Sequence, residues 1–156
     1  MKRHAILATM SLLMVATILM PLSVFGQASP AVTGAGEAVL PGSTSFSGVS
    51  INSELFGAGV FIPGDGTAVG EFQATLLGIN VLGQTQTIVV EGEAASGSIG
   101  AGNGTFSGAA TVNMGDGTPP LINVPITVTA TPTSLLLILS NVNLPATLTA
   151  GNITIY

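Results

Sequence analysis

Apolar and polar residues alternate with a period of two along most of the chain beyond residue 30. In residues 105–114 the even-numbered positions are apolar or small, and the odd-numbered positions are mostly Thr, Ser and Asn. The same alternation occurs in residues 69–76, 87–94 and 122–130. This pattern is typical of antiparallel strands that bury one face and expose the other to water.

Shorter stretches complete the set of expected strands, and turn sequences separate them. The further strand candidates are residues 32–40, 44–52, 55–62, 134–140 and 147–155. Asp-Gly and Asn-Gly steps are strong hairpin signals because they accept the positive φ of tight turns. The expected turns lie at Pro63–Gly66, Gly102–Gly104, Gly115–Gly117 and Gly151–Asn152.

Glycines inside the expected strands indicate strong curvature. Gly48, Gly70 and Gly108 each lie two residues from a phenylalanine on the same face, an arrangement found at bends that an aromatic ring covers. Pro125 cannot donate to a ladder, so its strand should lie at an edge or a bulge. We therefore predict that residues 29–156 form a single all-β domain, an antiparallel flattened barrel or sandwich of eight to ten strands.

Short sequence motifs recur in the same order in the two parts of the domain. Gly-Asp-Gly-Thr occurs at residues 64–67 and 115–118, and Phe-Ser-Gly at residues 46–48 and 106–108. An internal duplication would give two similar halves. Chance recurrence in a chain built from few residue types gives the same observation, so both explanations stay open.

Residues 1–28 have the layout of a secretory signal peptide. A basic start at residues 2–4 is followed by an apolar stretch over residues 5–20, and Pro21 ends the expected helix. Cleavage after Gly26 or Ala28 fits the small-residue rule. Because the apolar stretch is shorter than the ~20 residues of a membrane span, we expect cleavage and export rather than a membrane anchor.

The composition beyond the leader excludes most catalytic chemistry. No Lys, Arg or His follows residue 4, and the chain contains no Cys or Trp. Without a proton acceptor such as His or Lys, the serines cannot act as activated nucleophiles. Zinc, copper and iron sites lack their usual ligands. Nucleic acid and anionic lipid are poor partners because no cation could neutralise their phosphates.

Carboxylates are the remaining candidates for chemistry. Asp65 and Asp116, both in Gly-Asp-Gly-Thr turns, are the candidate ligands for calcium, which prefers carboxylate and backbone oxygens. Turn geometry alone also explains them. Glu91 and Glu93 share one strand face at roughly 6.5–7 Å, a spacing compatible with glycoside hydrolysis. Exposed glutamates more often serve solubility, so no catalytic residue and no required cofactor is assigned.

These observations predict a secreted, non-enzymatic protein with a structural or interaction role in the extracellular space or at the cell surface. Self-association or binding to a surface partner would suit that role, and we expect no stable membrane insertion after cleavage. The alternative is a small barrel that binds an apolar ligand. A carboxylate-based glycoside hydrolase is the third hypothesis.

Overall fold

The computed structural model describes residues 29–156, so the expected signal peptide at residues 1–28 lies outside the described part. The described chain is all-β, with no helix. Its strands are β1 (Ala31–Val39), β2 (Ser45–Phe46), β3 (Val49–Phe61), β4 (Thr67–Ile79), β5 (Thr85–Gly100), β6 (Asn103–Asn113), β7 (Leu121–Thr131), β8 (Ser134–Leu139) and β9 (Val142–Ile155).

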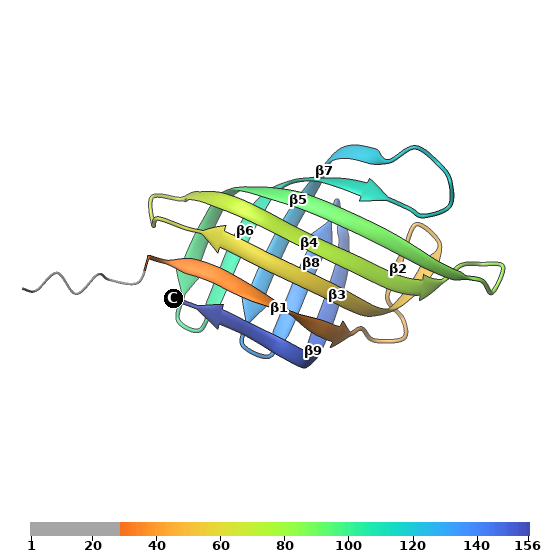
Figure 1. Cartoon of the computed structure of the whole chain (residues 1–156), viewed down its shortest axis with the longest axis horizontal. Helices are drawn as coiled ribbons and strands as arrows, with labels where there is room; N and C mark the ends of the chain where they lie inside the picture. The colour runs from red at the N-terminus through yellow and green to blue at the C-terminus, as the bar shows by residue number, and fades with distance from the viewer. Residues whose placement is uncertain (1–28) are drawn as a thin grey trace, which may run out of the picture.

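The strands form a closed, antiparallel eight-stranded barrel (Figure 1). From β3 onward each strand pairs with the next in sequence, and β1 closes the barrel by pairing with both β3 and β9. The two-residue β2 is an outlying pairing on the start of β3. Since closure removes the sheet edges, the prediction of a barrel or sandwich resolves to a barrel.

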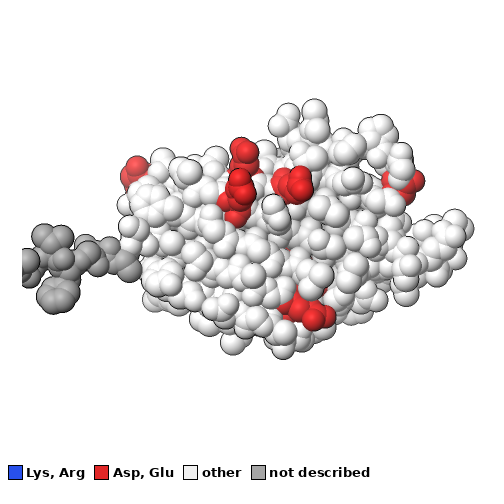
Figure 2. All heavy atoms as spheres, in the orientation of Figure 1, with Lys and Arg blue, Asp and Glu red and all other residues white. Residues whose placement is uncertain are grey.

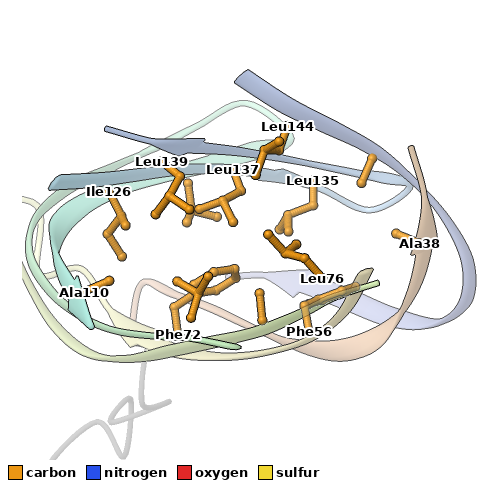
Figure 3. Packing of buried hydrophobic residues seen from close by; sticks show 14 of the residues in the cluster. Ala38, Phe56, Phe72, Leu76, Ala110, Ile126, Leu135, Leu137, Leu139 and Leu144 are labelled. Carbon is orange, nitrogen blue, oxygen red and sulfur yellow. The ribbon is translucent and has the colours of Figure 1, made fainter. Parts of the chain in front are cut away.

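The alternation read from the sequence separates the inside of the barrel from its outside. The expected inward positions of β4, β5 and β6 include Phe72, Ile88 and Phe106, and all three are buried. Leucines of β8 and β9 face Phe56, Phe72 and Leu76 across an elongated ring of strands (Figure 3). Outward positions hold many Thr, Ser and Glu residues together with exposed apolar side chains. Among residues 29–156, no helix has the length and apolar character to cross a membrane.

Glycines permit close contact between strands where the barrel bends. A Cβ on Gly108 would lie 1.8 Å from the Glu93 carbonyl oxygen, and one on Gly70 would lie 2.0 Å from the Gly59 carbonyl oxygen. Gly70 also has a φ of 146°. Both positions therefore require glycine. Gly48, expected inside a strand, lies instead in the turn between β2 and β3.

Several expected boundaries were wrong because bulges keep strands continuous. The candidates 44–52 and 55–62 are largely one strand, β3, in which the ladder to β4 shifts between Ile51 and Ser53. Gly151–Asn152 is not a turn but part of β9, where Gly151 has a φ of 94°. Pro125 is not on an edge strand, because β7 pairs with both β6 and β8. It lies opposite Ala109, close to the β6–β7 register shift and directly before the β7–β8 ladder begins at Ile126, where its missing N–H is tolerated.

The recurring motifs do not mark equivalent positions. Residues 64–67 join β3 to β4 at the barrel end that holds the C-terminus, whereas residues 115–118 lie between β6 and β7 at the opposite end. Residues 46–48 turn from β2 into β3, whereas residues 106–108 lie inside β6. The motifs therefore give no support for two duplicated halves.

Candidate functional site

The two candidate calcium ligands, Asp65 and Asp116, lie at opposite ends of the barrel and cannot share an ion. Each carboxylate instead closes its own turn. Asp65 accepts hydrogen bonds from the backbone N–H of Thr67 at 2.9 Å and from the Thr67 hydroxyl. Asp116 accepts the same pair of bonds from Thr118, with the N–H at 3.0 Å.

These bonds account for the electrostatics of both turns. Donation from the Thr67 and Thr118 hydroxyls, and then from their N–H groups, lowers the pKa of Asp65 and of Asp116. Among residues 29–156, no group of three or more acidic side chains has the arrangement of a metal site. The turns thus have a full structural explanation, and calcium binding by either one stays a prediction.

Three other carboxylates gather on the outer face of the barrel. Glu71 on β4 lies directly opposite Glu93 on β5, and Gln73 lies opposite Glu91 one step along the same face. All four side chains are exposed. Figure 2 shows red carboxylate groups close together near the middle of one face, and no blue on the part of the chain that the structure describes. Because the described chain contains no cation, these carboxylates have no opposite charge of their own.

A groove of about 740 Å³ runs beside this acidic group. We call it the outer groove; its lining includes Glu71, Glu91, Glu93, Gln73, Thr111, Ile122 and Asn123. A second hollow of about 520 Å³ shares Glu71 and Gln73 and has a floor of Gly57, Gly59 and Gly70. The outer groove brings Glu91 and Glu93 together with a third glutamate, but it leaves all three open to water.

Sequence reasoning placed Glu91 and Glu93 on one face and missed Glu71 as their neighbour. Glu71 stands on another strand, and only the register of β4 on β5 sets it opposite Glu93. Alternation fixes which face a residue occupies, not which residue of the next strand it meets. Nothing in the sequence could therefore have assembled this group of carboxylates.

Glu54 is the exception among the acidic residues, because it lies inside the barrel. Its side chain is 0% exposed, and neither carboxyl oxygen has a hydrogen-bond partner. Its register neighbours are Ala38 on β1 and Leu76 on β4, and both are fully buried. Burial raises the pKa of Glu54 to about 8, because the charged form loses its hydration there.

A bulge explains why Glu54 faces inward. The register of β3 on β4 shifts between Ile51 and Ser53, so Ile51 before the shift and Glu54 after it both point into the barrel. Strict alternation would place them on opposite faces. Sequence reasoning assigned Glu54 to a gap between two strands. Its position two residues before the inward Phe56 was the signal that could have placed it inside.

Exposed apolar side chains gather at the barrel end opposite the C-terminus. Val81 and Leu82 form the tip of the β4–β5 hairpin and are 86% and 77% exposed. Leu121 and Ile122 begin β7 at the same end and are also exposed. Self-association stays a prediction, and this end is where a second copy would meet apolar surface.

Comparison with protein-family models, with curated proteins and with solved structures finds no match for this chain. Function must therefore be argued from the geometry of the barrel itself.

Proposed function

We propose that this chain is a secreted, non-enzymatic structural or interaction protein of the extracellular space or cell surface, and that its outer groove binds a basic segment of a partner protein. The supporting observation is the filled interior. Aromatic and aliphatic side chains from opposite walls meet inside the ring of strands (Figure 3). A partner therefore has to meet the outside of the barrel.

The filled interior favours this function over that of a barrel carrying an apolar ligand. Carrier barrels keep an internal space of roughly 300 Å³ or more for the ligand. Here the centre of the barrel is filled by side chains of one hydrophobic cluster. Four of them are 0% exposed: Phe72, Leu76, Phe106 and Leu137. The two hollows described above lie outside the barrel wall.

The charges around the outer groove favour a basic partner. Glu71 and Glu93 face each other across two strands, and like charges at directly opposed positions repel. A Lys or Arg side chain placed between them would replace that repulsion with attraction. Opposite charge across an interface accelerates encounter and selects partners, and salt weakens it.

The closed antiparallel ladder makes the groove a rigid platform. Glu71, Glu91 and Glu93 stand on paired strands rather than on loops, so their backbone positions are already fixed before a partner binds. The open, exposed setting of these carboxylates suits recognition of a charged surface.

A charge-matched pair of variants tests the proposal. The groove variant carries Glu71→Gln, Glu91→Gln and Glu93→Gln, and the control variant carries Glu37→Gln, Asp65→Asn and Asp116→Asn. Both lose three carboxylates, and Asn keeps the acceptor oxygen of each turn. Binding of a hexalysine peptide is measured by titration calorimetry at 20 mM and at 500 mM salt.

We expect the groove variant to bind hexalysine about tenfold more weakly than the control at low salt, and the difference to vanish at high salt. Equal weakening in both variants would show that only overall charge matters, and the outer groove would then not be the binding site. Failure of the unaltered protein to bind the peptide would also overturn the proposal.

A further inference from the structure

Glu54 occupies the inner face of the barrel without any polar partner. Its neighbours across the ladders are Ala38 and Leu76, and its inward neighbours along β3 are Ile51 and Phe56. All four are apolar and buried. A buried carboxyl group without hydrogen bonds is costly when neutral and much more costly when ionised.

No other charge in the described chain compensates Glu54. Glu37 is on β1 next to Ala38 but points to the outer face, and Glu71 on β4 does the same. No titratable residue occurs in β6, β7, β8 or β9 between Asn103 and Ile155 apart from Asp116 in the β6–β7 loop. The remaining groups are exposed: Glu91, Glu93, Asp65 and Tyr156.

The strand that faces Glu54 is the one that closes the barrel. We call the β1–β3 pairing, Ala31–Val39 with Ser53–Phe61, the seam. β1 buries only Val32 and Ala38 deeply, because much of its sequence is glycine and small residues. Strands with few buried apolar contacts open at low free-energy cost.

The ladders on both sides of the seam are irregular beside Glu54. The β3–β4 register shifts between Ile51 and Ser53, and the β1–β9 register shifts between Glu37 and Ala38. Each shift leaves a residue unpaired and weakens the ladder locally. At the Glu54–Ala38 pair, therefore, β3 has an irregular ladder to β4 and β1 has an irregular ladder to β9.

We propose that Glu54 is a pH-sensitive latch on the seam: the protonated carboxyl keeps β1 paired with β3, and loss of the proton opens the pairing around Ala38. Opening lets the carboxylate reach water and exposes the backbone edges of β1 and β3. Such edges readily pair with another strand, so the latch would make strand exchange with a partner dependent on pH.

The electrostatics give the direction of the switch. Burial raises the pKa of Glu54 from 4.5 to about 8, so the closed state holds the proton more tightly than an open state does. Stability of the seam is complete below pH 4.5 and is lost as the pH rises through about 8. The open population should rise about tenfold per pH unit between these limits and then level off.

Hydrogen exchange on the full chain tests the latch. Amide exchange is followed between pH 5 and pH 9 in the unaltered protein and in Glu54→Gln, which keeps the shape of the side chain but cannot lose a proton. The ratio of the exchange rates of the two proteins at each pH removes the intrinsic pH dependence of exchange. We expect the relative opening of β1 amides to grow about tenfold per pH unit up to about pH 8.

Two further variants separate the latch from other causes. Glu54→Leu also removes the titrating group and should give pH-independent protection even if Glu54→Gln folds poorly. Glu37→Gln changes the neighbouring outward carboxylate and should keep the unaltered pH dependence. The proposal is overturned if β1 exchange has the same pH dependence with and without Glu54. It is equally overturned if β6 and β7 amides open as much as β1, because the barrel then unfolds as a whole.

Discussion

Glu54 and Glu71 stand on neighbouring strands, yet one carboxyl lies inside the barrel and the other lines the outer groove. The inner carboxyl has apolar neighbours only, and its protonation is controlled by the loss of water around it. The outer carboxyl faces another carboxylate, Glu93, but both remain hydrated. The inner carboxyl therefore makes stability depend on pH, whereas the outer carboxyl is placed to interact with salt ions or a cationic partner.

The comparison shows that the free-energy cost of a substitution depends on which side of the barrel wall the side chain lies. Inside the barrel, side chains are closely packed, and a substitution changes the unfolding free energy by several kcal/mol. Outside, water screens charges, and single changes cost little. Substitutions inside the barrel should therefore have larger effects than matched substitutions on its outer face.

Replacing Glu54 should have the largest effect. Because its folded pKa is raised, the stability linked to its neutral form is complete below pH 4.5 and lost as the pH rises to about 8. The unaltered protein should lose up to about 5 kcal/mol of unfolding free energy over that range. Glu54→Leu should lose none of this. Urea unfolding at pH 5 and pH 9 measures both, and parallel losses in the two proteins would contradict the buried setting of Glu54.

Truncating the centre of the core should come next. Phe72 is 0% exposed, and its ring centroid lies 6.0 Å from that of Phe106. Phe72→Ala should cost about 3–5 kcal/mol, because a cavity replaces these contacts. Ile122→Ala is the outer control: its side chain is 72% exposed, so the change should stay within about 0.5 kcal/mol. Thermal unfolding compares the two, and similar costs would refute the division between inside and outside.

Much of this division could be predicted from the sequence. The period of two assigned the buried face of β4, β5 and β6, and the glycines at 70 and 108 lie inside strands as expected. These are local signals, since each depends on residues within one strand. The turn at Asp65 was likewise predicted from four consecutive residues.

Bulges and register could not be predicted, because they depend on the neighbouring strand. Ile122 was expected on the inward face, but Asn123 has a φ of 56° and the β6–β7 register shifts beside it, so Ile122 turns outward. A similar shift turns Glu54 inward. One extra residue in a strand reverses every assignment beyond it.

Removing one carboxylate of the Glu71–Glu93 pair should stabilise the barrel modestly, whereas the substitution at Phe72 destabilises it. Glu93→Gln removes repulsion with Glu71 and should stabilise the barrel by about 0.2–1 kcal/mol at low salt. Added salt should reduce the gain. Glu37→Gln is the matched control, because its register neighbours are Leu55 and Ala150. Urea midpoints at two salt concentrations measure the difference, and a gain that ignores salt would mean that charge is not its cause.

The smallest effect is expected at the two turns, and its sign opposes that of Glu54. The threonine donors lower the pKa of Asp65 and Asp116, so the stability linked to these carboxylates is present above their ordinary pKa of 3.8 and is lost as the pH falls. Asn accepts the same bonds but does not titrate. In the double variant Asp65→Asn and Asp116→Asn, Tm should fall less between pH 5 and pH 2 than in the unaltered protein. An unchanged acid profile would mean that the Thr67 and Thr118 bonds add nothing to folding. A smaller fall would show that acid weakens the exposed turns, which is the opposite pH direction from the loss expected at Glu54.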